Sequence, residues 1–593
     1  MKSFLKSVSA CIHLSWKASK LYTIARLFLN LCTPLLSFFQ VLIGKYIINI
    51  LAGAIDIEEP AHILLVFMTL LLFCNIFRTL IQKAQYYMQS MHDDTINRDI
   101  SLAVMDKVGK ADIEHFDNAE YYDKITSFSR DASIVTYLLW NILSAISSIF
   151  TVIVSFLALC KLNSYYGIIT ISASIPSAIV SAKYSKALYS LSLEQINGER
   201  QKNYLYNLLI DKRFAMDLRL FDVCETVKNK YKKIWSAIFN KKKTINKRQT
   251  ILTGALESLP ELVVALIGII IAFQTLSGEI TVGDYSLYVG LLSQLWSAVY
   301  ILTNSLKEIY DNQLKIKNLK TLDTFDNHIL DKGEKTLTRI DTISFEHVSF
   351  CYPNTCKEIL HDVSFSICAG EKIALVGING SGKSSIIKLL LRMYDINCGS
   401  ILINGIDIRE YRLSDLRKNF SVYFQDDPSY SFSLRENITI SDIGKDNDDS
   451  GVIKAIIQGG AEDILDNAPS GLDTYITRMF DNSGIELSGG QYQKLALARV
   501  FYRRYSTLVL DEPSSFLDPE AEHMLFERIK NLTNGQTVLF TSHRLINTFL
   551  ADRIIVIENG RIIETGTHNE LLANEGRYAE LFRYQAERYK PKK

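Results

Sequence analysis

The sequence has no excess of charge of either sign, and it has few charged residues at all. Its 593 residues include 65 Lys and Arg against 64 Asp and Glu, a net charge of +1, and charged residues make up 22% of the chain. Without a basic field, no nucleic-acid partner is expected. Hydrophobic residues make up 48%, which argues against disorder and indicates that part of the chain lies in lipid.

The chain also lacks paired cysteines. Its nine cysteines are scattered, with no C-x-x-C and no spacing typical of metal ligands. This pattern argues against a disulfide scaffold and against a zinc site, and it fits a reducing cytosol.

Acidic residues are absent from the first 55 positions, as they are from many targeting peptides. A signal peptide is rejected because the apolar run that starts at Leu21 is too long. A transit peptide is rejected because Arg26 is the only arginine where several are expected. Residues 1–20 are instead predicted to form an amphipathic helix on the inner membrane surface.

Long apolar runs are present, and all of them lie in the first half of the chain. A helix needs about 20 apolar residues to cross about 30 Å of hydrocarbon, and six runs meet that condition. Buried helices of a large soluble protein are the alternative, which six such runs together disfavour. The predicted spans lie near 21–43, 62–82, 133–160, 165–189, 251–275 and 285–306.

Flanking charges predict the orientation, because Lys and Arg are retained on the cytoplasmic side. The segments 83–132 and 190–250 are basic, whereas the loop 44–61 carries Lys45 beside three acidic residues. That loop is expected outside, and both termini are expected in the cytoplasm of a multi-pass plasma-membrane protein. The two basic segments have a helical pattern and are too long for turns, so the spans should extend beyond the lipid.

After Ile343 the pattern changes to short β-type runs that alternate with helices. This predicts a soluble α/β domain with a parallel sheet. We expect a membrane domain over 1–320, a polar linker over 321–340 and a cytoplasmic domain over 341–593. The predicted fold class is an α-helical membrane domain of six transmembrane helices followed by an α/β domain.

One motif of the second domain is typical of phosphate binding. The apolar run 373–376 is typical of a buried strand, a G-x-x-x-x-G-K-S loop follows over 377–384, and a helix opens at Ser385. Backbone N–H groups of such a loop surround phosphate, Lys383 reaches the β and γ oxygens, and the Ser384 hydroxyl binds Mg²⁺. A chance glycine-rich turn is the alternative. The candidate ATP-binding residues are Gly377, Asn379, Gly380, Ser381, Gly382, Lys383, Ser384 and Ser385.

Two further motifs extend this chemistry. An apolar strand ends at Asp511 and Glu512, where phosphoryl transfer needs one acid for Mg²⁺ and another for the attacking water. The pentapeptide Leu487-Ser488-Gly489-Gly490-Gln491 precedes it and opens a helix that can bind a second anion. A simple helix cap remains the alternative for this pentapeptide.

These three motifs, in this order, resemble the nucleotide-binding domain of an ABC transporter, a P-loop NTPase domain with a helical subdomain. The pentapeptide is close to diagnostic of that family. Four further matches follow from the resemblance. They are Tyr352 as the aromatic that stacks on adenine, Gln425 of the Q-loop, Ser514 to Asp518 as the D-loop, and His543 in Thr541-Ser542-His543-Arg544 as the switch histidine.

The resemblance implies a role for each residue. The implied catalytic residues are Glu512, which would polarise water, His543, which would contact the γ-phosphate, and Gln425. The implied Mg²⁺ ligands are Ser384, Gln425 and Asp511. The implied partner surface for ATP is Ser488, Gly489, Gly490 and Gln491 of a second chain, so the expected partner is a second copy or a related half-transporter.

Six spans fused to such a domain resemble an exporter half-transporter. The stretches 278–284 and 112–124 are similar to those of bacterial exporters of peptides, lantibiotics included. The resemblance implies ATP-driven export of a peptide or amphipathic small molecule by alternating access of a dimer. A lipid flippase or multidrug exporter is the alternative within this class, and an ATP-gated regulator without net transport is the alternative outside it. Short helices near 113–122 and 209–218 are expected to press into the nucleotide-binding domains.

Glu257 and Glu261 are the candidate substrate residues. They lie one helical turn apart in the cytoplasmic third of the fifth span, on either side of Pro260. One hypothesis places them at a cavity that accepts cationic or amphipathic cargo. The alternative is that the helix extends below the lipid and water solvates both carboxylates.

Overall fold

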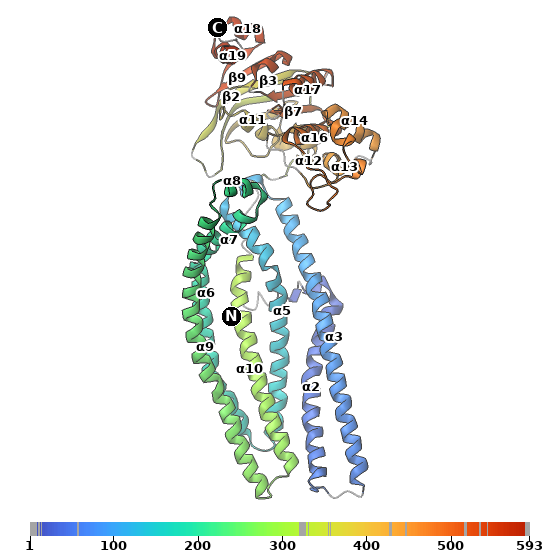
Figure 1. Ribbon diagram of the computed structural model, residues 1–593, viewed down its shortest axis with the longest axis vertical. Helices are drawn as coiled ribbons and strands as arrows, with labels where there is room; N and C mark the ends of the chain where they lie inside the picture. Colours follow the sequence, from blue (N-terminus) through green and yellow to red (C-terminus); the bar gives the residue numbers. More distant parts are fainter. Residues whose placement is uncertain are drawn as a thin grey trace. The chain divides into compact units, whose positions relative to one another are not determined.

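The computed structural model describes residues 9, 12–13, 15–55, 59–319, 328–329, 331–353, 355, 357–425, 430–444, 448–514, 517, 519–532, 535–542 and 544–587. The chain divides into two compact units (Figure 1). The first comprises residues 1–110 and 119–325, and the second comprises residues 111–118 and 326–593. Most of the predicted N-terminal amphipathic helix lies outside the described residues. The predicted switch residue His543 and residues 515, 516 and 518 of the predicted D-loop also lie outside them.

Six helices among the described residues are long and apolar enough to cross a membrane, which confirms the six predicted spans. Each predicted run coincides with part of a longer helix, as the length of the basic connections indicated. Two short helices, α7 (Ile196–Ile210) and α8 (Ala215–Leu220), lie in the second of those connections. The long helices are α2 (Lys20–Leu51), α3 (Pro60–Gly109), α5 (Ala119–Leu159), α6 (Ser164–Glu194), α9 (Cys224–Leu276) and α10 (Val282–Leu319).

Small side chains allow α6 to pack closely against its neighbours, and Figure 1 shows it running beside α9. Ser177, Ser181 and Ser185 form a buried row at four-residue spacing on α6. A Cβ added to Gly167 would lie 2.7 Å from Phe156 Cδ2 of α5. Small residues at such spacing are what close approach between membrane helices requires.

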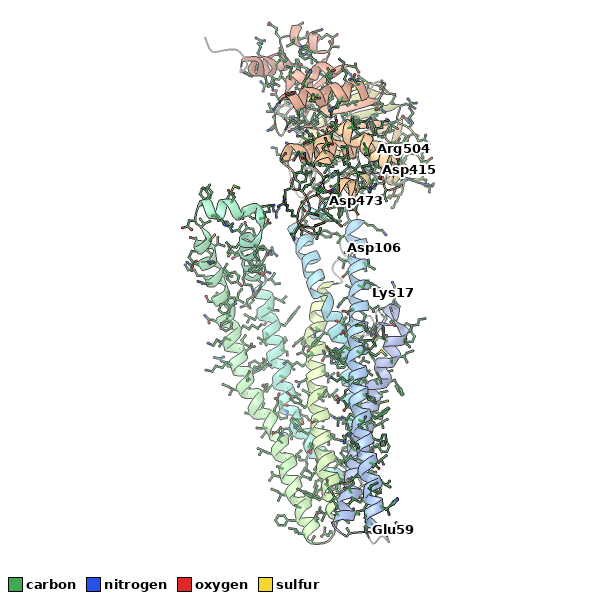
Figure 2. All side chains as sticks on the ribbon, turned by 45° about the vertical axis from the view of Figure 1, so that its right-hand side comes forward. Lys17, Glu59, Asp106, Asp415, Asp473 and Arg504 are labelled. Atoms are coloured by element: carbon green, nitrogen blue, oxygen red, sulfur yellow. The ribbon has the colours of Figure 1, made fainter. Side chains whose placement is uncertain are left out.

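The two ends of the helical bundle are marked by the ends of α3. Figure 2 shows Glu59 at one end and Asp106 toward the other. At the Glu59 end, Lys45 Nζ of α2 lies 2.6 Å from Asp284 Oδ1 of α10. The Asp284 carboxylate also accepts a 2.6 Å hydrogen bond from the Thr281 hydroxyl. The motif 278–284 therefore joins the first and last long helices at this end.

Two sheets form the core of the second unit. The larger has the strand order β10-β9-β3-β8-β7-β6, and β9, β3, β8, β7 and β6 are parallel, as predicted. The smaller has the order β2-β1-β4-β5, is antiparallel and was not predicted. The strands are β1 (Thr342–Cys351), β2 (Glu358–Cys368), β3 (Lys372–Val376), β4 (Cys398–Ile403), β5 (Ile406–Asp407), β6 (Phe420–Tyr423), β7 (Thr507–Asp511), β8 (Thr537–Thr541), β9 (Arg553–Glu558) and β10 (Arg561–Gly566).

Helices cover the sheets and form a separate subdomain. Leu434, Val452, Ile464 and Leu495 belong to one buried apolar cluster of α13 to α16, which is the predicted helical subdomain. The helices of this unit are α4 (Ile113–Phe116), α11 (Lys383–Leu390), α12 (Leu413–Lys418), α13 (Leu434–Thr439), α14 (Asp449–Gly459), α15 (Glu462–Asp466), α16 (Gly489–Tyr502), α17 (Pro519–Leu532), α18 (His568–Ala573) and α19 (Arg577–Glu587).

The central strands β7 and β8 contain only buried side chains, as in parallel sheets covered on both faces. Parallel strands place their carboxyl ends at one edge, where ligands bind in open α/β sheets. The loops after β3, β6, β7 and β8 all leave from that edge. It therefore brings together residues that lie more than a hundred positions apart in the sequence.

The short segment 111–118 packs with the second unit, although it lies between two membrane helices in the sequence. The Tyr394 hydroxyl donates a 2.8 Å hydrogen bond to Asp117 Oδ2. The Ile329 N–H donates a 2.9 Å hydrogen bond to Asp112 Oδ2. Of the two short elements expected to press into the nucleotide-binding domains, the one near 113–122 lies partly in the second unit, through residues 113–118, and the one near 209–218 lies in the first unit.

Candidate nucleotide site

The loop between β3 and α11 depends on its glycines. Gly380 and Gly382 have φ of 79° and 108°, in the left-handed region that favours glycine. A Cβ on Gly382 would also lie 2.6 Å from Leu360 Cδ2. Ser381 is 2% exposed, and its buried Oγ has no hydrogen-bond partner among the described residues. An open glycine loop with an unpartnered buried hydroxyl fits a polar ligand such as a phosphate group.

Lys383 begins α11 and is 4% exposed. Its ammonium donates hydrogen bonds of 2.9 and 3.1 Å to the carbonyl oxygens of Gly377 and Ile378. Burial lowers the pKa of Lys383, and the carboxylates of Glu512 and Asp511 act in the opposite direction. The lysine therefore lies within the phosphate-binding loop and within electrostatic reach of both acids.

Thr541 joins the two acids at the end of β7. Its hydroxyl donates a 2.7 Å hydrogen bond to Asp511 Oδ1 and accepts a 2.9 Å hydrogen bond from the Glu512 N–H. Glu512 has a φ of 52°, a left-handed conformation that costs a non-glycine residue about 1–3 kcal/mol and is common at functional sites. Sequence reasoning missed the role of Thr541, although the residue belongs to the motif that was matched through His543.

Gln425 adds a side chain from the end of β6 to the sheet edge that carries Asp511 and Glu512. It follows β6, and its side-chain N–H donates a 2.8 Å hydrogen bond to Glu512 Oε2. The structure therefore brings the predicted residues Gln425, Asp511 and Glu512 together with Lys383. Ser384 and Ser385 occupy the first turn of α11 beside them.

Tyr352 is anchored next to the same helix. Its hydroxyl lies 3.0 Å from Ser385 Oγ, and its ring packs edge-on against Phe350 and Tyr394 with centroids 4.9 and 5.1 Å away. Lys388 Nζ lies 5.6 Å from the centroid of the tyrosine ring. These contacts fix an aromatic ring beside the start of the phosphate-binding helix.

The pentapeptide 487–491 caps α16, as its alternative interpretation predicted. Ser488 Oγ accepts a hydrogen bond from the Gln491 N–H, and the Gln491 side chain accepts one from the Ser488 N–H. Gln491 Nε2 also donates a 3.0 Å hydrogen bond to Asp463 Oδ2. Within the described part of the chain, no hydrogen bond connects Ser488 or Gln491 to Lys383. The cap leaves Gly489 exposed at the start of a 14-residue helix.

The two candidate substrate residues occupy α9 on either side of the buried Pro260. Glu257 is half-buried, whereas Glu261 is exposed in the single chain. The sequence predicts that they lie one helical turn apart in the cytoplasmic third of the fifth span. Their different burial indicates that Glu261 faces further from the neighbouring helices than Glu257 does.

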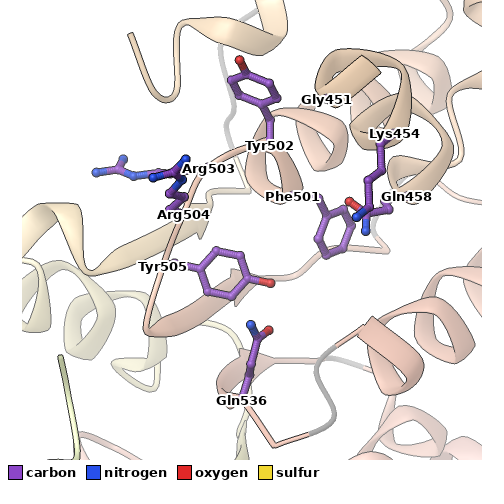
Figure 3. Close-up of a pocket in the computed structure, with 9 residues that line it drawn as sticks. All are labelled: Gly451, Lys454, Gln458, Phe501, Tyr502, Arg503, Arg504, Tyr505 and Gln536. Carbon is purple, nitrogen blue, oxygen red and sulfur yellow. The ribbon is translucent and has the colours of Figure 1, made fainter. Parts of the chain in front are cut away.

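A hollow of about 400 Å³ lies elsewhere in the second unit (Figure 3). Tyr505 and Gln536 line it just before β7 and β8, so it lies at the amino ends of these strands, opposite to the edge that carries Glu512. Burial raises the pKa of the Tyr505 hydroxyl to about 12. Its other lining residues are Gly451, Lys454, Gln458, Phe501, Tyr502, Arg503 and Arg504. The hollow is therefore separate from the candidate nucleotide site.

A six-helix membrane unit joined to a P-loop unit with a helical subdomain defines a half-transporter driven by ATP. Comparison with known proteins gives the same class. The chain matches the family described as ABC transporter over residues 360–515 and the family described as ABC transporter transmembrane region over residues 22–299.

Relatives match nearly the whole chain. It is 30% identical to the subtilin transport ATP-binding protein SpaT of Bacillus subtilis over 545 residues, which cover 92% of this chain and 88% of the relative. It is 25% identical to the nisin transport ATP-binding protein NisT of Lactococcus lactis subsp. lactis over 589 residues, 99% and 97% of the two chains. The solved structure of a bacterial Atm1-family ABC exporter with ATP bound has a TM-score of 0.78, at 21% identity over 97% of this chain and 99% of the other.

The chain therefore belongs to the ABC transporter family. It is a multi-pass membrane protein of exporter architecture that binds ATP and couples ATP hydrolysis to transport.

Proposed function

We propose that this chain exports a peptide, by analogy with two relatives whose names specify transport of subtilin and of nisin. The observation that carries the proposal is that the match to these subtilin and nisin transport proteins extends over both units. The proposed orientation places both termini and the ATP-binding unit in the cytoplasm of a plasma-membrane protein. Export of another amphipathic small molecule, lipid flipping and multidrug export remain alternatives within the same family.

The phosphates of ATP would bind the glycine loop and Lys383, with adenine against Tyr352. The amide of Gln425 would hold the Glu512 carboxylate in place, and Glu512 would accept a proton from the attacking water. The switch residue His543 would contact the γ-phosphate, as the family resemblance implies. In this arrangement the Thr541 hydroxyl would orient both Asp511 and Glu512 through its two hydrogen bonds.

The residues at this edge fit a magnesium ion. Ser384, Asp511 and Gln425 offer hydroxyl, carboxylate and amide oxygens, which are the ligand atoms that Mg²⁺ prefers. When bound, Mg²⁺ neutralises charge on the β- and γ-phosphate oxygens. The hydrogen bond from Thr541 would hold Asp511 in the orientation that the ion needs.

The working unit is proposed to be a homodimer with two equivalent sites, in which the second surface for ATP comes from the partner's residues at 488–491. Support comes from the site itself, because α16 presents Gly489 to solvent. Among the described residues, Ser488 and Gln491 bond to each other and to Asp463 rather than to Lys383. ATP bound across two chains favours the closed dimer, and hydrolysis removes that bias. A related half-transporter encoded elsewhere is the alternative partner.

A cross-link between chains tests the shared site. Because Ser381 is buried, the exposed neighbour Asn379 is the better attachment point. We expect that Asn379→Cys on one tagged copy and Ser488→Cys on another are joined by a short bifunctional thiol reagent when ATP is present, giving a covalent dimer on a denaturing gel.

The matched control replaces Asn379→Cys by Gln458→Cys on α14, which lines the hollow at the amino ends of β7 and β8 and should give no ATP-dependent product. A copy that carries both cysteines and links only within itself would contradict the shared site.

A double substitution tests the substrate residues. If Glu257 and Glu261 line the cavity, their charges are costly in low dielectric, and a cationic cargo relieves that cost. Glu257→Gln with Glu261→Gln should then lower cargo-stimulated ATPase activity for cationic peptides and leave basal ATPase unchanged, as measured in proteoliposomes. Equal stimulation in variant and parent would assign both residues to the solvated part of the helix.

Cargo class is tested by a screen of ATPase stimulation in proteoliposomes. Peptides should raise the rate, whereas neutral drugs and added lipids should not. Stimulation by lipid or drug alone would favour the flippase or the multidrug exporter. An ATPase that responds to none of them would favour the ATP-gated regulator.

A further inference from the structure

A cluster of metal-ligating side chains lies apart from the nucleotide site, around the short helix α4. Asp112, Glu114 and His115 each offer one ligand atom, and these atoms lie within 4.8 Å of one another. A fourth group comes from a distant part of the sequence, because His328 Nδ1 lies 2.6 Å from Glu114 Oε1. The rings of His115 and His328 are 6.5 Å apart between centroids. All four residues belong to the second unit.

We propose that Asp112, Glu114, His115 and His328 form a binding site for a divalent transition-metal ion of the zinc class. Two imidazoles and two carboxylates are a ligand set that suits Zn²⁺, whereas Mg²⁺ and Ca²⁺ prefer sites built of oxygen atoms alone. Tetrahedral ligands at about 2.0–2.2 Å from zinc lie about 3.4 Å from one another. The ligand atoms of Asp112, Glu114 and His115 already lie within 4.8 Å of one another, and the exposed His328 side chain is free to turn toward them. The cysteine pattern argued against a zinc site, but this ligand set contains no cysteine.

The burial of two of the ligands and a backbone hydrogen bond to one of them indicate that the site is preformed. Asp112 and His115 are each 8% exposed, so two of the four candidate ligands lie inside the protein. The Ile329 N–H holds Asp112 Oδ2 at 2.9 Å, a contact that orients a ligand in the way outer-shell groups commonly do. The same contact places His328, the preceding residue, beside Glu114.

The site would tie two segments that are more than two hundred residues apart in the sequence. Segment 111–118 connects α3 to α5, and His328 precedes the first strand of the nucleotide-binding unit. A metal ion would thus join segment 111–118 to the residues that precede β1, within the second unit. Metal binding at this cluster is independent of the nature of the cargo and of the catalytic role of Glu512.

Metal binding to the full-length protein tests the proposal. The protein, purified without a histidine tag and treated with a chelator, is titrated with Zn²⁺ against a chromophoric competitor. We expect one saturable site per chain, and substitution of a ligand in His115→Ala or His328→Ala should raise the dissociation constant about tenfold or more. Because the His328 side chain is 75% exposed, its replacement should leave the fold intact even if the change at His115 does not.

The matched control is His347→Ala. His347 pairs with a single carboxylate, Asp362, at 2.7 Å, so this variant should bind Zn²⁺ as the parent does. Bound zinc should also raise the unfolding temperature of the parent and not that of His328→Ala. Absence of saturable binding, or equal affinity in the parent and His328→Ala, would reduce the cluster to an ion pair between Glu114 and His328 and overturn the proposal.

Discussion

Glu512→Gln should lower ATP turnover by about 100-fold or more, because it removes the general base that activates water. ATP binding should persist. The amide oxygen of the new side chain can still accept the hydrogen bond that Gln425 now donates to Glu512 Oε2. The hydrogen bond to the Thr541 hydroxyl comes from the backbone N–H of residue 512, which the substitution leaves in place. The variant should therefore retain ATP in a closed dimer, as measured by phosphate release beside the amount of nucleotide that stays bound after rapid gel filtration.

Glu527→Gln is the matched control, because it removes one negative charge away from the nucleotide site. Glu527 lies on α17 with a half-exposed side chain that faces Lys530 at 4.0 Å, and this variant should turn over ATP at the parental rate. Near-normal turnover in Glu512→Gln would contradict the catalytic role of this carboxylate.

Lys383→Ala should weaken the binding of ATP. The ammonium is buried in the loop, and ATP would replace its present bonds to the carbonyl oxygens of Gly377 and Ile378 with bonds to phosphate. Hydrogen bonds to charged groups contribute about 1.5–3 kcal/mol, which corresponds to roughly a 10- to 100-fold rise in the dissociation constant for ATP. Fluorescence of a labelled nucleotide analogue measures that constant.

Lys372→Ala removes the same charge from the other end of β3, so its ATP affinity should match the parent's. Thermal unfolding without nucleotide separates loss of the fold from loss of the phosphate contact. An unchanged ATP affinity in folded Lys383→Ala would contradict the assignment of the phosphate-binding loop.

The parallel part of the fold could be predicted because each of its strands carries a local signal. The runs at 373–376 and 508–510 are apolar on both faces, as a strand buried on both sides must be. The first is followed by the glycine-rich loop that leads to Lys383, and the second by the acidic residues Asp511 and Glu512. The positions of Lys383, Asp511 and Glu512 at one edge then follow from the rule that parallel strands end together. Sequence order and sheet topology are therefore enough to predict where these three residues lie.

Other features of the fold and of the candidate sites depend on long-range contacts, which no local sequence pattern predicts. Thr541 is an ordinary strand residue in the sequence, and only the pairing of β7 with β8 places its hydroxyl between Asp511 and Glu512. The antiparallel sheet was missed because β1 and β2 pair through several register shifts, which weaken the alternation of apolar and polar residues. The meeting of Glu114 with His328 likewise requires a long-range contact.

The most direct test of ATP-driven export is vectorial movement of cargo. Proteoliposomes with the ATP-binding unit on the outside are given a fluorescently labelled peptide, ATP and Mg²⁺, and the labelled peptide inside the vesicles is measured over time. The account predicts accumulation against the gradient that stops without ATP and is abolished in Glu512→Gln vesicles. ATP hydrolysis at the parental rate with no accumulation of any peptide, lipid or drug tested would contradict the exporter and favour an ATP-gated regulator.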